Sequence, residues 1–297
     1  MTGASIDRSW SCRFGALSVC LVTLIGALIG GIPARLEAEE KPAEVSWESL
    51  RFRASKFGIS ATSAVDRSLV PGEVRNLPKD SGQKWKVAIA TRYVGRSSNQ
   101  EIFFGEDGKV LVTTSWRASG TSSYRNERVY GLDGVKRHRQ SPKTKDESKK
   151  PWSAWTETSS WTEPYPEGFQ DCQGISDPGV LLHFLSSPNL QLLEGLCFFS
   201  KKALWRIAVT DLGSETMQVE YTDRRQGKAV PIRKAVEARK ISVQPALLHG
   251  DPDSEFRLLG LEGDLTVQLH PAGGFPLRLA GRMPKLGKVT VFLETVE

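Results

Sequence analysis

The sequence predicts a mainly β fold, an antiparallel, strongly curved sheet or open barrel packed on one short helix. Three observations predict it: apolar and polar residues alternate with a period of two over many segments, turn formers separate those segments, and one short stretch has helical spacing. The chain of 297 residues leaves room for one large β domain, or two small ones, after a leader is set aside. We expect a signal peptide at 1–38, a polar tail at 39–46 and a single β-rich domain at 47–297.

The leader has the features of a secretory signal peptide. Arg8 and Arg13 precede the apolar run 14–32, and small residues lead to Ala38 before two glutamates. A basic start, an apolar centre and a small residue at the exit are typical of a cleaved signal. The alternative is an uncleaved anchor, because the run is about as long as a membrane-spanning helix. We therefore expect export to the periplasm or cell envelope, or secretion, with membrane attachment only through this segment.

Strands are expected wherever apolar side chains recur at every second position. The turn-rich segment 71–84 separates the second strand from the third. Asp-Gly pairs in Phe104–Gly108 and Tyr130–Gly134 favour hairpins, because both turn positions need positive φ. Calcium loops are the alternative there, but each turn offers too few oxygen ligands. The C-terminal meander, 261–297, is expected at the closing edge of the sheet. The expected strands are 47–55, 59–65, 85–93, 109–116, 205–209, 217–221, 228–243, 264–270, 275–282 and 288–294.

The one expected helix covers 178–186. Asp177 is placed to cap it, Pro178 occupies its first turn, and the apolar residues after them share one face, which should lie against the sheet. His183 flanks that face, where a histidine more often packs than binds a metal.

Two cysteines, Cys172 and Cys197, remain after the leader. In an exported protein such a pair is expected to form one disulfide, which would close a loop of about 25 residues and contribute about 3 kcal/mol. The alternative is two unpaired, buried thiols. Neither cysteine belongs to a CxxC motif, which argues against a redox-active pair.

Residues 136–150 are strongly basic and contain no apolar residue, so we expect a mobile loop. It is either a solvated loop or a contact for an anionic surface such as lipid headgroups or acidic glycans. Export and a formal net charge of only +6 make nucleic acid an unexpected partner. The candidate contact residues are Lys136, Arg137, Arg139, Lys143 and Lys145.

Aromatic residues are concentrated in the segment 151–166. Its spacing fits neither a strand face nor a helix face, so the cluster either lines a ligand groove, stacking for example on sugar rings, or packs a long loop onto the sheet. The candidate ligand-binding residues are Trp152, Trp155, Trp161 and Tyr165, with Trp205 on a later strand.

Catalytic and cofactor motifs are missing from the sequence. It contains no GxSxG, HExxH, GxxxxGK[ST] or GxGxxG pattern, and its four histidines are far apart. No metal, cofactor or catalytic residue is therefore predicted. Paired carboxylates for glycoside hydrolysis would first be sought at Glu163, Glu167 and Asp171, beside the tryptophans.

Several short motifs resemble a known family. They are Leu50–Ile59 (LRFRASKFGI), Asp177–Leu182 before a leucine-rich stretch ending near Cys197, the Phe-Pro-Leu-Arg at 275–278, and the closing GKVTVFL at 287–293. Together they resemble the exported, β-rich proteins grouped as domain of unknown function 3108, discontinuously over residues 47–297. The resemblance implies a curved antiparallel sheet or open barrel in the cell envelope, and it implies no activity or catalytic residue.

Three functions are compatible with these features. The first is a non-enzymatic envelope protein that holds a hydrophobic or amphipathic ligand, or a partner, on the apolar side of its curved sheet. The second is a module that binds glycans or acidic polymers through the aromatic and basic segments. The third is a hydrolase without a recognisable motif.

Overall fold

The computed structural model describes residues 47–70, 82, 84–93, 96–185, 190–200, 202–272 and 274–297. The signal peptide and polar tail predicted for 1–38 and 39–46 lie outside these residues, as does nearly all of the loop predicted for 71–84. The described residues belong to one compact unit, Pro42–Glu297.

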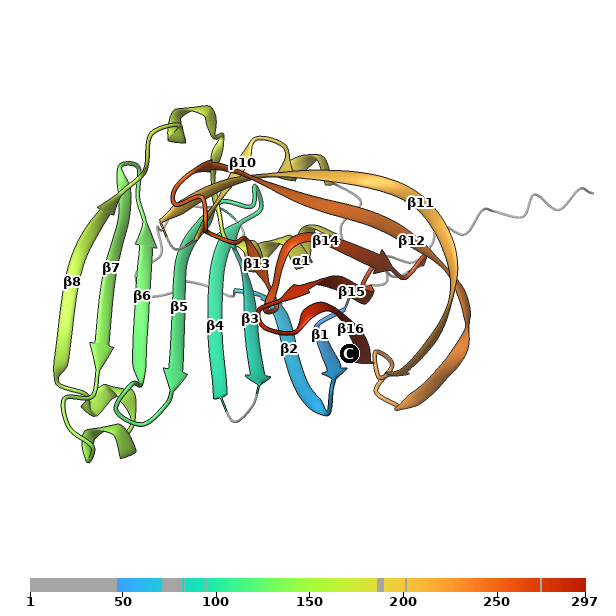
Figure 1. The fold of residues 1–297 in the computed structure, drawn as a ribbon, viewed down its shortest axis with the longest axis horizontal. Coiled ribbons are helices and arrows are strands. Elements are labelled where there is room, and N and C mark those ends of the chain that lie inside the picture. Colours follow the sequence, from blue (N-terminus) through green and yellow to red (C-terminus); the bar gives the residue numbers. More distant parts are fainter. Residues whose placement is uncertain are drawn as a thin grey trace, which may run out of the picture. The chain divides into compact units, whose positions relative to one another are not determined.

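This unit is mainly β, as predicted, and its strands belong to one sheet (Figure 1). The first eight strands are consecutive antiparallel neighbours in the sheet, and both predicted Asp-Gly turns are hairpins, between β4 and β5 and between β6 and β7. These strands are β1 (Ser49–Lys56), β2 (Ile59–Leu69), β3 (Lys84–Tyr93), β4 (Arg96–Gly105), β5 (Val110–Ala118), β6 (Tyr124–Tyr130), β7 (Gly134–Ser141) and β8 (Glu157–Pro164).

The second group of strands continues the sheet from β1, in the order β1-β16-β15-β14-β12-β11-β10-β9, with β13 paired to β14. Two pairings are parallel, β9 with β10 and β11 with β16, so the sheet is mixed rather than purely antiparallel. The β11–β16 pairing closes a ring of five strands. The strands are β9 (Gly174–Ser176), β10 (Leu196–Ser200), β11 (Ala203–Asp223), β12 (Val230–His249), β13 (Arg257–Leu258), β14 (Leu261–Leu269), β15 (Pro276–Met283) and β16 (Gly287–Val296).

The long hairpin of β11 and β12 makes this ring possible. Its strands have 21 and 20 residues, and Figure 1 shows them arching together from β10 towards the C-terminus. The segment 228–243, which the sequence predicts as strand, lies almost wholly in β12. The C-terminal meander is also present as β14, β15 and β16. Its expected place at the edge of the sheet is wrong, however, because β16 pairs with β1 and the described edges are β8 and β9.

The short helix α1 (Leu181–Leu185) covers the sheet where the sequence predicts it. It continues a 3-10 turn, η4 (Pro178–Val180), and four of its five side chains are buried. His183 packs between rings, 4.7 Å from Trp85 and 5.2 Å from Phe104 between centroids. The other 3-10 turns are η1 (Glu147–Lys149), η2 (Trp152–Ala154), η3 (Phe169–Asp171) and η5 (Leu190–Leu193).

The prediction of a mobile loop at 136–150 is wrong for residues 136–141, which belong to β7. This strand has two neighbours: it pairs with β6 on one side and with β8 on the other. Its arginines rest on aromatic rings, with Arg139 5.3 Å from the centre of Tyr124. The buried Val135 is its one aliphatic side chain, and beyond it hydrogen bonds and long arginine stems hold the strand. The aromatic segment after it begins with η2 and continues as β8.

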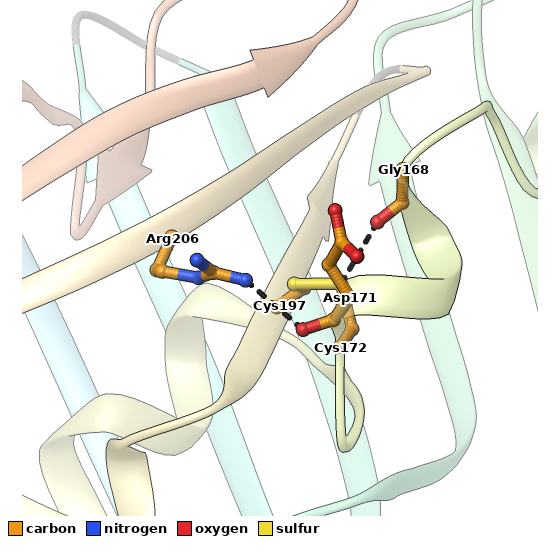
Figure 2. Close-up of a disulfide and its surroundings, with 5 residues drawn as sticks. All are labelled: Gly168, Asp171, Cys172, Cys197 and Arg206. Carbon is orange, nitrogen blue, oxygen red and sulfur yellow. Dashed lines mark hydrogen bonds between the residues drawn. A yellow bond between two sulfur atoms is a disulfide. The ribbon is translucent and has the colours of Figure 1, made fainter.

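Cys172 and Cys197 form the predicted disulfide (Figure 2). Cys197 lies on β10, whereas Cys172 comes directly after η3, so the bond fastens this turn to the sheet. Arg206 of the neighbouring strand β11 donates a hydrogen bond of 3.0 Å to the main-chain oxygen of Asp171 (Figure 2). A disulfide of this kind is consistent with an oxidising, exported location.

Candidate functional site

A cleft of about 340 Å³ lies between one face of strands β3 to β6 and the segments that carry η4 and β13. We call it the arginine cleft, after Arg128 of β6 and Arg257 of β13 in its wall. Aliphatic groups of Ile89, Leu258 and Leu259 share the lining with polar side chains. Small-molecule sites are typically concave and combine an apolar lining with a few polar groups, and this cleft has that composition.

The polar wall of the cleft arises from strand alternation. Side chains at every second position of β3 to β8 form one face, and we call it the inner face because η4 and α1 pack on it. One cross-strand row on this face changes from aliphatic to polar and then to aromatic. In order from β3 to β8, the row is Val87, Ile102, Thr113, Arg128, Arg137 and Trp161.

Asp177 forms the end of the cleft below the helix. Its Oδ1 accepts a hydrogen bond of 2.9 Å from the amide of Gly179, and its Oδ2 accepts one of 2.9 Å from Gln100 Nε2. Glycine suits this position, because a Cβ would lie 2.4 Å from Ile102 Cδ1 and would displace that side chain. Burial raises the pKa of Asp177, and the hydrogen bond from Gly179 and the charge of Arg128 oppose that rise. The neutral carboxyl is therefore favoured over a wider pH range than in water.

Arg128 and Arg137 are directly opposite each other on β6 and β7. Like charges in this arrangement repel, so each needs compensation. Arg137 has a partner in an ion pair with Glu163, whose side chain is 9% exposed. Burial lowers the pKa of Arg137, and the charge of Arg128 lowers it further, although a guanidinium remains charged in proteins.

The positive charge of Arg128 is less well neutralised than that of Arg137. Asp177 is the acid that acts on it, and burial favours the neutral form of that acid. Within the described part of the chain, the buried Nε atoms of Arg128 and Arg137 have no hydrogen-bond partner. Two adjacent guanidinium groups with unused donors would be stabilised by an anion, because Arg forms charge-assisted hydrogen bonds with carboxylate and phosphate groups.

Tyrosine hydroxyls lie beside the arginines. Tyr124 lines the cleft, below the guanidinium of Arg139. Burial, and then the charge of Asp177, raise the pKa of Tyr130. Tyr130 is therefore a neutral hydroxyl at physiological pH, able to donate or accept a hydrogen bond.

The five predicted aromatic ligand residues do not come together. Trp152 lies 4.3 Å from the guanidinium of Arg125, which is on the face of β6 opposite to Arg128. Trp155 donates its Nε1–H to the main-chain oxygen of Glu147. Neither residue lines the arginine cleft.

The other three aromatic residues are separated as well. Tyr165 stacks on Phe169, with 4.2 Å between ring centres, and donates a hydrogen bond to the main-chain oxygen of Gly131. Trp205 is buried against Phe256. Trp161 alone is on the inner face, 42% exposed and 6.0 Å from the guanidinium of Arg137.

The predicted basic contacts divide between three places. Arg137 and Arg139 share the inner face of β7, whereas Lys136 points to the opposite face. Lys143 and Lys145 lie in the connection between β7 and β8. Two of the five therefore extend the positive face of the arginine cleft towards the edge strand β8.

The three carboxylates that the sequence singled out, Glu163, Glu167 and Asp171, differ in their surroundings. Glu163 is engaged by Arg137, Glu167 is exposed, and Asp171 contacts Arg206 through its main-chain oxygen. The described residues contain no group of three or more His, Cys, Asp or Glu side chains suited to a metal ion.

Most of the residues that line the cleft were not predicted as site residues from the sequence. Arg128, Gln100 and Tyr124 lie in strands with many polar residues, where no local pattern marks one face as covered. Asp177 was recognised as a helix cap only. Its position before Pro-Gly was the one available indication. A capping side chain lies against the first turn of the helix that it caps, and this turn packs on the sheet.

A second hollow, of about 870 Å³, lies between the β11–β12 hairpin and strands β1 and β16. Most of its charged groups compensate one another: Arg53 pairs with Glu294, and Arg233 pairs with Glu220, which leaves Lys234 as the other cation of the lining. It therefore offers less unused charge to a ligand than the arginine cleft.

Comparisons with protein-family models, with curated proteins and with solved structures found no match for this chain. None of the helices in the described residues is both long and apolar enough to cross a membrane.

Proposed function

We propose that this is a non-enzymatic, exported protein of the cell envelope that binds a small amphipathic molecule through an anionic group in the arginine cleft. The anion would contact Arg128, and the apolar part of the molecule would lie against Ile89 and Leu259. The cleft volume of about 340 Å³ is at the lower end of the range for small-molecule sites, which favours a compact ligand.

One observation carries this proposal: Arg128 and Arg137 lie side by side with unused Nε donors. Their local acids are Glu163, which pairs with Arg137, and Asp177, whose ionisation burial disfavours. Positive charge without full compensation is costly inside a protein. A ligand anion is the simplest means of supplying the missing charge.

The proposed location rests on the signal-like leader and is supported by the disulfide. Membership of the family grouped as domain of unknown function 3108 belongs to the same proposal, because that family is exported and β-rich. Detection of the processed protein in an envelope fraction, with residues 1–38 absent from its N-terminus, tests the export. Recovery of the whole chain from the cytoplasm would contradict it.

The ligand proposal is tested by calorimetric titration with octyl phosphate, and with octanol as the uncharged analogue. Octyl phosphate should bind and octanol should not. The change Arg128→Gln should weaken octyl phosphate binding about 10- to 100-fold, because hydrogen bonds to charged groups contribute about 1.5–3 kcal/mol.

The matched control is Arg233→Gln, which removes an exposed guanidinium from the second hollow. It should leave the affinity unchanged. Equal binding of octanol, or equal affinity in the parent and the Arg128→Gln variant, would contradict an anion site in the arginine cleft.

A second function is favoured by Trp161 alone. Its ring is 42% exposed on the same face as Arg137 and Arg139, an arrangement suited to an acidic glycan along β7 and β8. Retention on immobilised polygalacturonate should fall in Trp161→Ala. Trp152→Ala is the control, because Trp152 is 46% exposed but lies over the opposite face. Equal retention of both variants would exclude this use of Trp161.

A further inference from the structure

The turn between β1 and β2 exposes a large aromatic side chain without packing it. It has two central residues, Phe57 and Gly58, between the paired residues Lys56 and Ile59. Phe57 is 82% exposed. Figure 1 shows this turn at the lower end of β1 and β2, where the chain reverses. Burial in the fold therefore does not explain a phenylalanine at this position.

The backbone of the turn also disfavours phenylalanine. Phe57 has φ +52° and Gly58 has φ +75°, a combination found in two-residue hairpin turns that prefer Asn, Asp or Gly at the first position. Positive φ is unfavourable for a bulky residue and tends to occur at sites of function. A residue that is both exposed and conformationally disfavoured suggests selection for an external contact.

The turn between β15 and β16 adjoins it and has the same character. Lys56 Nζ joins the two turns, because it donates hydrogen bonds of 2.7 Å to the main-chain oxygen of Leu286 and of 2.5 Å to that of Lys288. Lys285 in this second turn has φ +66° and is exposed. Of the four non-glycine residues with positive φ in the described part of the chain, two therefore lie in these adjoining turns.

Together the two turns combine apolar groups with positive charge. We name them the lysine tip, residues 56–59 and 283–288. The lysine tip contains three lysines and no acidic residue. The ammonium of Lys56 lies 5.2 Å from the centre of the Phe57 ring, and Leu286 is partly buried beside it. An exposed aromatic ring in a group of turns that carries lysines matches the boundary of an anionic lipid bilayer, where apolar side chains insert and lysines meet headgroups.

We propose that the lysine tip docks this protein onto an anionic lipid surface, with Phe57 inserted among the acyl chains and Lys285 and Lys288 at the headgroups. This contact is independent of the arginine cleft and adds to any attachment through the N-terminal segment. Charge complementarity selects an anionic lipid surface over an uncharged protein surface, because the tip combines three lysines and no acidic residue with one exposed aromatic ring.

The test is hydrogen exchange of the full chain, with mass spectrometry of peptides that cover 56–59 and 283–288. A local readout is needed because the apolar run 14–32 can bind vesicles independently. Vesicles that contain phosphatidylglycerol should slow exchange in both turns, and vesicles of phosphatidylcholine alone should not. Titration of the lipid gives the affinity of the tip.

Two variants separate insertion from charge. Phe57→Asn suits the turn better than phenylalanine, so the variant should fold normally while losing protection of the tip. Replacing Lys285 and Lys288 by Gln should weaken the affinity about fivefold for each lysine. Leu132→Asn is the matched control, because Leu132 is 90% exposed in another turn and precedes an aspartate. It should behave as the parent does.

Three outcomes would overturn the proposal. They are equal protection by neutral and anionic vesicles, unchanged protection in Phe57→Asn, and no protection by either vesicle. The last result, combined with protection by a protein from an envelope extract, would assign the lysine tip to a protein partner instead.

Discussion

The inner face continues from β3 onto β2 and β1, and its two halves differ in the polarity of their side chains. On β1 to β3 it presents the fully buried Leu50, Phe52, Val65 and Val87. On β5 to β7 it presents Thr113, Arg128, Arg137 and Arg139 instead. The same backbone pairing carries both halves, so the difference lies in what covers them.

The covering element is too short for the whole sheet. The eight residues of η4 and α1 reach about 13 Å, whereas eight strands span about 34 Å. Contacts of this element fall on β3 and β4, through Ile89, Ile102, Trp85 and Phe104. On β5 to β7 polar side chains replace most of the aliphatic ones, although Val135 of β7 is still fully buried. We expect the half under the helix to contribute most to stability, and we propose the other half as the binding surface.

The largest effect on stability is expected from a substitution in the covered half. Phe184 of α1 is 2% exposed and packs on Phe104, so Phe184→Ala should lower the free energy of unfolding by about 3–5 kcal/mol. Urea denaturation measures the change. Leu132→Ala, at a 90% exposed position, is the control and should have little effect. A loss below about 1 kcal/mol for Phe184→Ala would mean that α1 does not hold the sheet.

A second prediction uses pH to probe the same half. Burial, and then the charge of Arg67, lower the pKa of His183 to about 4. Below pH 6.5 the unfolded chain binds a proton that the folded protein does not bind until about pH 4, so stability should fall as the pH decreases through this window. The full effect is on the order of 3 kcal/mol.

His183→Gln isolates this effect from the other titrating groups. The difference in unfolding free energy between the parent and His183→Gln should depend on pH between about 6.5 and 4 and be constant above about pH 7.5. A constant difference across the whole range would show that His183 is solvated and that the helix does not seal the sheet.

The smallest effect is expected in the uncovered half. Arg128→Met keeps the length of the side chain and removes its charge, which also ends the repulsion with Arg137. Because replacement of a poorly compensated charge by an apolar group is often neutral or stabilising, the unfolding free energy should stay within about 1 kcal/mol or rise. Binding of octyl phosphate should nevertheless be lost. A loss of stability comparable to that of Phe184→Ala would assign Arg128 a structural role instead.

The covered half was predictable from the sequence, whereas in the uncovered half only β5 and the two Asp-Gly hairpins were predicted. Alternation of Val87 and Ile89 with polar residues predicted β3, and the spacing of Leu181, Phe184 and Leu185 predicted the helix. These signals are local, because each strand or helix must bury its own apolar side chains. The disulfide was predictable from a count of cysteines.

Long-range pairing left no local signal. The basic segment of β7 contains nothing that identifies it as a strand, since its pairing with β6 and β8 and its contacts with Tyr124 and Trp161 come from other parts of the chain. The C-terminal meander was recognised but placed at the edge, because alternation within β16 does not reveal that its partner is β1. Arg128 became a candidate only when its neighbours Arg137 and Asp177 were in place.

The pairing of β1 with β16 determines when this protein can finish folding. Leu50 pairs with Val296, so β1, the first described strand, completes its hydrogen bonds only after β16, the last described strand, has been made. The five-strand ring also closes only after β16 has been made, because Thr222 of β11 pairs with Thr295 of β16. Contacts between residues this distant in sequence form slowly, since a long loop must close first. Until then β1 and β15 each present an open edge, so loss of β16 would leave a chain prone to aggregation.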